Sequence, residues 1–150
     1  MEFYDILVFI HIISAIVGMG PGFLMIMPVK TATTMTELRY GFRIRAKLHW
    51  LVMIGGTLLL LTGLAMGVLR PFLFSQGWYV TSLLLFLLAL AFGPLVLSPR
   101  SKPIKNLLQM HHEDTIPDEY FNLSKKLFFY ERIESLLFFL IIILMITKPF

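Results

Sequence analysis

One histidine lies inside an apolar segment and is the first candidate for chemistry in this sequence. His11 stands within residues 3–27, and this stretch is long enough to cross a bilayer, because a membrane-spanning helix needs about 20 apolar residues. An imidazole is costly to bury there and is by default a candidate functional group. Neutral imidazole is also the commonest transition-metal ligand. We therefore expect His11 to bind a metal, foremost the iron of a haem. The alternatives are a structural hydrogen bond, another metal or a proton relay.

Small residues follow this histidine on the same face of the expected helix, and a second helix repeats the pattern. Small side chains let membrane helices pack closely, which is one interpretation. The other is a slot that leaves room for a flat porphyrin, and both can hold at different levels of one groove. The residues in question are Ser14, Gly18 and Gly22 after His11, and Gly56, Gly63 and Gly67 after His49.

The two histidines are expected at different depths in the bilayer. With a helical rise of about 1.5 Å per residue, His11 lies roughly 6 Å outward of the midplane and His49 roughly 14 Å inward of it. We predict that they do not share one haem. The residues level with His11 on the second helix are Thr62 and Gly63, and neither is a strong ligand. A haem on His11 would then have an open or weakly held sixth position, which suits gas or oxygen chemistry.

Polar residues are also expected at both ends of the apolar core. Arg70, at the outer end of the second helix, could pair with haem propionates or simply extend to the interface. At the opposite end, several charged residues are expected at the depth of His49. They predict a structural ion-pair network, a second haem on His49 or a route for protons. These residues are Arg45, Glu131, Arg132 and Glu134.

The composition is that of an integral membrane protein. Of the 150 residues, 57% are hydrophobic and 15% are charged. The absence of cysteine excludes disulfides, thiolate-held iron–sulfur clusters and covalently attached c-type haem. The net charge of +4 comes from two basic loops and gives no sign of nucleic-acid binding.

Hydropathy predicts an all-α membrane protein with a single domain, 1–150, built as an antiparallel bundle of four transmembrane helices. The first segment lacks a basic start and is not expected to be a cleaved signal. The basic loops 28–47 and 98–126 are expected in the cytoplasm, which places both termini outside. A bundle striped with glycine often dimerises, so a homodimer is also expected. The predicted spans are 3–27, 48–69, 78–97 and 127–147.

The loops themselves carry helix signals. Thr34 and Glu37 have the spacing of a capping box, which predicts a helix that runs into the second span. Pro117 precedes two acidic residues and predicts a helix start that continues into the fourth span. A short surface helix is expected over 101–112.

The stretch His11-Ile-Ile-Ser-Ala-Ile-Val-Gly-Met-Gly resembles the first helix of HemJ-type protoporphyrinogen oxidases. It is also similar to copper-resistance-D-like membrane proteins and to a related family of uncharacterised bacterial integral membrane proteins. The ending Lys148-Pro149-Phe150 resembles the end of HemJ-type chains. This resemblance implies that His11 binds haem. HemJ-type proteins carry a lysine one turn after a tryptophan, whereas Trp78 has none, so the uncharacterised relatives fit better.

These features predict a b-type haem protein of the bacterial cytoplasmic membrane, with His11 as axial ligand. Its expected chemistry is redox or diatomic-gas chemistry with O₂, NO or a quinol. The alternatives are a HemJ-like protoporphyrinogen oxidase and a copper-resistance-like transporter without haem, the latter suggested by soft methionine side chains. The expected partners are the lipid bilayer, a porphyrin or gas ligand, and an electron donor.

Overall fold

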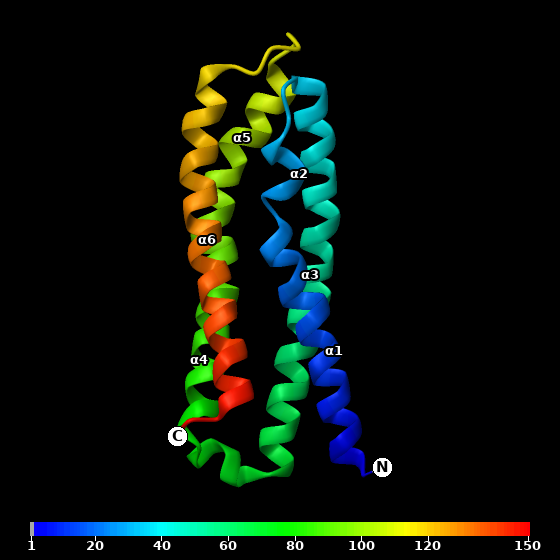
Figure 1. Ribbon diagram of the computed structural model, residues 1–150, viewed down its shortest axis with the longest axis vertical. Coiled ribbons are helices and arrows are strands. Elements are labelled where there is room, and N and C mark those ends of the chain that lie inside the picture. Colours follow the sequence, from blue (N-terminus) through cyan, green and yellow to red (C-terminus); the bar gives the residue numbers. More distant parts are fainter. Residues whose placement is uncertain (1) are drawn as a thin grey trace.

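The computed structural model describes residues 2–150, and these residues form helices with no β-strand. The helices make four long rods that alternate in direction, and both ends of the chain lie at the same end of the molecule (Figure 1). The first rod is α1 (Phe3–Leu24) with the short α2 (Met27–Lys30), and the second is α3 (Met35–Leu69). The third rod is α4 (Gly77–Phe92), η2 (Gly93–Leu97) and α5 (Ser98–Met110), and the fourth is α6 (Asp118–Thr147). The turn η1 (Pro71–Ser75) joins α3 to α4.

Three helical segments are long and apolar enough to cross a membrane, namely Phe3–Lys30, Met35–Leu69 and Gly77–Met110. They contain the first three predicted spans. The fourth rod is not among these segments. Three charged residues, Glu131, Arg132 and Glu134, lie in the early part of the span predicted there. Its uncharged remainder, 135–147, is only about 20 Å long at 1.5 Å per residue. Residues 2–150 are therefore all-helical with three membrane-length segments, and the crossing of α6 stays a prediction.

The helix starts follow the sequence signals. The Thr34 hydroxyl accepts a hydrogen bond from the Glu37 amide at 3.2 Å, and α3 begins directly after it. Likewise, α6 begins after Pro117. The short helix predicted over 101–112 is present as α5, Ser98–Met110. It continues the third rod through the π-helical turn η2, because Pro94 lacks the N–H of a regular α-helical turn and the wider turn accommodates it.

Helices α1 and α3 cross with their backbones in contact. A Cβ atom built on Gly18 would lie 2.7 Å from the Gly56 nitrogen, and one built on Gly55 would meet the Gly18 backbone. Any larger side chain at this crossing would push the helices apart. The glycines thus hold the first two rods together as one pair.

The third and fourth rods form the other pair, since α6 packs along α4 and α5. Far fewer residues join the two pairs: α3 contacts α4, and α1 contacts α6, at only a few positions. The end of the molecule opposite the chain termini is nevertheless filled by a core that includes Met35, Leu38 and Ile104, all fully buried. Open space between the two pairs consequently remains in the half of the molecule that contains the chain termini.

The α1–α3 crossing can be tested by adding a methyl group. We expect Gly55→Ala to destabilise the protein by about 1–3 kcal/mol, because overpacking forces backbone shifts. The loss is measured as a lower denaturation temperature of the purified protein in detergent. Gly20→Ala is the matched control, since an added Cβ there meets nothing within 4 Å. Equal denaturation temperatures of the two variants would contradict the close crossing.

Candidate functional site

A cavity of about 490 Å³ lies between the two helix pairs. All four rods contribute to its walls, and its size falls within the roughly 300–1,000 Å³ of small-molecule sites. The walls are apolar except for three side chains, which come from α1 and α4: His11, Tyr79 and Ser82. The cavity is therefore suited to a largely apolar ligand with a few polar contacts.

The His11 ring is held by a hydrogen bond to α3. Its Nδ1 lies 2.8 Å from Thr62 Oγ1. The Thr62 hydroxyl has a single hydrogen and directs it to the Leu58 carbonyl oxygen at 2.7 Å, as threonines in helices commonly do. Thr62 Oγ1 must then accept a hydrogen from His11 Nδ1. This assigns the neutral tautomer whose Nε2 carries the free lone pair.

The lone pair on Nε2 of His11 could coordinate a metal. No hydrogen bond within residues 2–150 involves Nε2 of His11, and His11 lines the cavity. Metal-binding histidines almost always donate their other N–H to a fixed acceptor, which sets the tautomer and raises the basicity of the ligating nitrogen. The His11–Thr62 pair has this arrangement.

The depth of His11 agrees with the sequence prediction. Thr62 is its hydrogen-bond partner, and a Cβ atom built on Gly63 would lie 3.3 Å from His11 Cε1. His49 lies on the same helix as Thr62, but about 20 Å away along the axis at 1.5 Å per residue. One metal ion cannot reach both histidines.

The other predicted cofactor-binding residues do not line the cavity, apart from Gly63. Ser14 is buried and donates to the Ile10 carbonyl oxygen at 2.7 Å. Gly18 is in the helix crossing, and a Cβ built on Gly22 would lie 2.9 Å from Phe138 Cε2. A Cβ on Gly56 would be in ordinary contact with Phe86, at 3.8 Å.

Close helix packing is therefore the better interpretation of Ser14, Gly18, Gly22 and Gly56. The face of α1 that carries the small residues is directed at α3 and α6. The cavity adjoins the neighbouring face, which carries Ile12, Ala15, Ile16 and Met19. The slot predicted along these glycines is therefore filled by neighbouring helices, and the cavity lies on the adjacent face of α1.

The wall formed by α4 was not predicted. Tyr79 donates its phenolic hydrogen to the Gly63 carbonyl oxygen at 2.9 Å, which ties α4 to α3 beside His11. Ser82 is 1% exposed, and its hydroxyl has no hydrogen-bond partner within residues 2–150. Tyr79, Ser82 and Phe86 share one face of α4 at helical spacing, a signal that the high hydropathy of this segment concealed.

Arg70 lies outside the cavity. It ends α3, and its guanidinium lies 3.7 Å from the centre of the Tyr4 ring. Its side chain is exposed at the end of the molecule where both chain ends lie. This stacking matches an interfacial arginine, and pairing with haem propionates stays a prediction.

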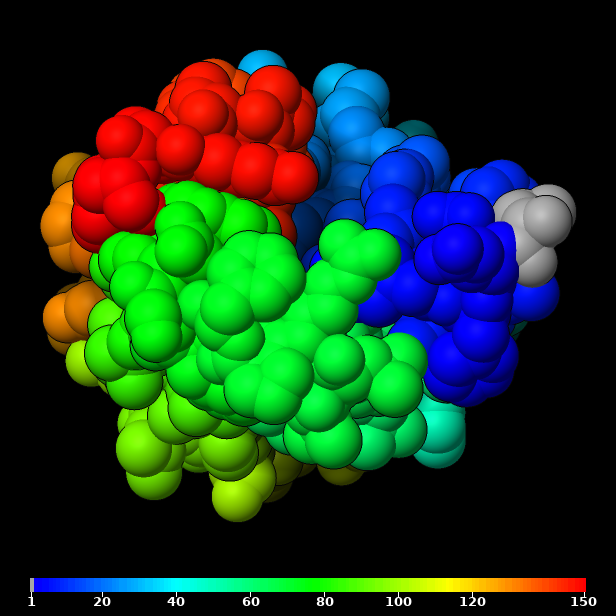
Figure 2. Space-filling view, turned by 90° about the horizontal axis from the view of Figure 1, so that it is seen from below, coloured from blue at the N-terminus to red at the C-terminus, as the bar shows by residue number. Residues whose placement is uncertain are grey.

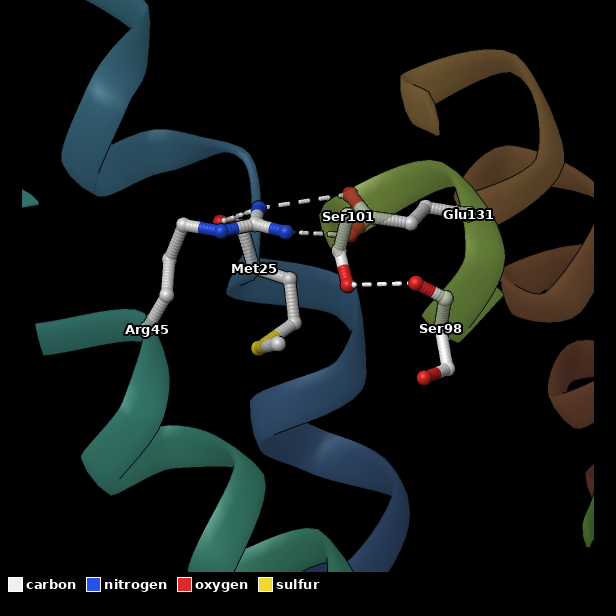
Figure 3. A network of polar contacts seen from close by, with 5 residues as sticks. All are labelled: Met25, Arg45, Ser98, Ser101 and Glu131. Atoms are coloured by element: carbon white, nitrogen blue, oxygen red, sulfur yellow. Dashed lines mark hydrogen bonds and ion pairs between the residues drawn. The ribbon is translucent and has the colours of Figure 1, made fainter. Parts of the chain in front are cut away.

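The second polar cluster is an ion pair at the other end of the apolar region. Arg45 and Glu131 are both buried, and Figure 3 shows the guanidinium between the Glu131 carboxylate and the Met25 carbonyl. Arg45 Nη1 donates to the Met25 oxygen at 2.6 Å and to Glu131 Oε2 at 3.3 Å, while Nη2 donates to Oε1. Of the predicted alternatives, the structural network is the one that the contacts support. His49 is exposed and has no part in this pair.

The Met25 carbonyl needs this donor because the first rod is broken there. The amide of Val29 would bind Met25 in a continuous helix, but it binds the Ile26 carbonyl oxygen at 3.2 Å instead. Pro28 lacks an N–H and so cannot bind Leu24. Arg45 therefore satisfies a backbone oxygen that the break between α1 and α2 leaves free.

The comparison with protein families gives a match over most of the chain. The sequence profile of a family described as "Predicted integral membrane protein (DUF2269)" matches residues 5–149. No curated protein and no solved structure matches the chain. The profile supports the predicted resemblance to an uncharacterised membrane-protein family. It does not address the resemblance to HemJ-type or copper-resistance-D-like proteins.

The buried ion pair can be tested by a double-mutant cycle. Arg45→Met alone should destabilise the protein by about 3–5 kcal/mol, because it leaves the Glu131 carboxylate buried without a partner. Glu131→Leu alone should have a similar effect. The double variant should lose less than the sum of the two single losses, measured by detergent-phase thermal denaturation. Simple additivity would mean that the two side chains do not interact.

Proposed function

The chain belongs to the DUF2269 family of predicted integral membrane proteins, and we propose that it is a b-type haem protein with His11 as the axial ligand. One observation carries the proposal: Thr62 fixes the His11 ring so that Nε2 is free beside a large apolar cavity. An imidazole so presented, with no cysteine available for covalent attachment, fits haem b.

The membrane arrangement is part of the proposal. The packing of α6 along α4 and α5 supports a fourth crossing beside them, although the uncharged part of α6 is short. The pairing of Glu131 with Arg45 lowers the cost of this placement. The basic loops then face the cytoplasm and both chain ends face outward, as in a bacterial cytoplasmic membrane protein.

The residues of the chain would bind, orient and shield the haem. His11 would hold the iron, Thr62 would fix the ring plane, and the apolar walls would exclude water. Haem supplies one-electron redox chemistry or reversible binding of O₂ or NO. No second nitrogen ligand lines the cavity, although the thioethers of Met19 and Met145 do. A weak or open sixth position favours gas chemistry or oxidation of a quinol.

One observation favours a second candidate. Met19, Met145 and His11 line the same cavity, and thioether with imidazole is a ligand set suited to Cu(I). A copper-transporting or copper-binding protein is thus the alternative. Metal analysis of the purified protein separates the two, since only the first contains porphyrin.

The test is the absorption spectrum of protein purified from haem-replete cells. We expect a Soret band that His11→Ala abolishes and His49→Ala, the matched control, leaves intact. Thr62→Val keeps the size of the side chain but removes the acceptor, so haem affinity should fall about 10- to 100-fold with the band retained. A featureless spectrum of the well-expressed wild-type protein would overturn the proposal.

A further inference from the structure

The exposure of the cavity walls is uneven. The lining residues of α3 and α4 are buried or half-buried, with Leu59 6% and Phe86 7% exposed. On α1 and α6, by contrast, exposed residues also line the cavity, with Ile16 63% and Ile146 76% exposed, although Met19 and Ile141 are buried. The cavity therefore has a closed back formed by α3 and α4 and a mouth between α1 and α6.

The helix contacts and the surface view agree with this mouth. Helices α1 and α6 touch at few positions. Figure 2, seen from the end with the chain termini, shows a recess between the C-terminal residues in red and α1 in blue. The mouth lies beside Ile12 and Ile16, in the middle of the first membrane-length segment, so it faces lipid tails rather than water.

Both axial ends of the cavity are covered by protein. Toward the end with the chain termini, Tyr79 packs edge-on against Phe74 with ring centres 5.4 Å apart, and its hydroxyl is tied to Gly63. Toward the opposite end, Phe23, which lines the cavity, packs edge-on against Phe138 of α6 with ring centres 6.4 Å apart. The side route is the one that the packing leaves open.

The back wall holds an unsatisfied polar atom. Ser82 lines the cavity, and its buried hydroxyl has no partner within residues 2–150. Such a group costs free energy unless something supplies a hydrogen bond. The walls near it are apolar, so a bound ligand is the available source of that hydrogen bond.

We propose that the cavity takes its ligand from the bilayer: a lipid-soluble molecule passes between α1 and α6, and an oxygen atom of that molecule hydrogen-bonds the Ser82 hydroxyl. Under the proposed function this molecule is haem, and the inference depends on that function for the identity of the ligand but not for the route. The proposed route predicts that the ligand is dissolved in the membrane before it reaches the protein.

The absence of cysteine makes the route testable with a single introduced thiol. Ser82→Cys in lipid vesicles should react with a lipophilic maleimide and resist a charged, water-soluble one. Ile16→Trp, added to block the mouth, should slow the lipophilic reaction several-fold. Ile13→Trp is the matched control, because Ile13 is also exposed on α1 but does not line the cavity.

Three results would overturn the route. They are equal labelling by the charged reagent, no labelling of the folded Ser82→Cys protein by either reagent, and equal rates in the Ile16→Trp and Ile13→Trp proteins. Haemin, added first, should protect the thiol. Normal labelling without protection by haemin would support the route and count against the haem proposal.

The role of the hydroxyl is tested separately. Ser82→Ala should weaken haemin binding about 2- to 10-fold, the value of one net hydrogen bond. Leu83→Ala on the same wall removes apolar surface without touching a polar group and serves as the comparison for a loss of packing alone. An unchanged haemin affinity of Ser82→Ala would overturn the proposed contact.

Discussion

The arrangement of the helices depends on one polar requirement. In a bilayer no water is available to a free backbone carbonyl, so the oxygen that the break at Met25 exposes must find a donor inside the protein. Arg45 supplies that donor, and its own charge then requires Glu131. This chain of contacts fastens α1, α3 and α6 together at one level. Beyond that level no comparable polar contact joins α1 to α6 within the described residues, and the two helix pairs leave a cavity between them.

A second contact determines what faces that cavity. Because Gly18 and Gly55 bring the antiparallel α1 and α3 into backbone contact, the residues two turns from the crossing toward the chain termini also meet. His11 and Thr62 are those residues, and their 2.8 Å contact is a consequence of the crossing. The glycine stripe therefore contributes to the site indirectly. It makes no slot for a ligand, but it sets the distance at which Thr62 can hold the imidazole ring.

Much of the fold was predictable, because local signals determine it. Thr34 and Pro117 mark helix starts, and simple depth arithmetic places His11 beside Thr62 and Gly63. Periodicity indicates which residues share a helix face, but it does not say which neighbouring helix that face meets. The small-residue face of α1 was thus assigned to the ligand, whereas it packs against protein. Ser82 was not predicted for a different reason. A serine in an apolar helix normally donates a hydrogen bond to its own backbone, so nothing in the sequence marked its hydroxyl as unpaired.

The polar atoms of the cavity argue that it is a binding site rather than a packing defect. An apolar void between loosely joined helices would simply fill with lipid tails, and nothing would favour polar side chains on its walls. Here Nε2 of His11 has no partner within residues 2–150, and the buried, unpaired Ser82 hydroxyl on another wall carries an energetic cost in this surrounding. The same surrounding makes each contact to a ligand stronger than it would be in water. A lipid-soluble molecule with a metal beside His11 Nε2 and an oxygen beside the Ser82 hydroxyl would give both groups a partner.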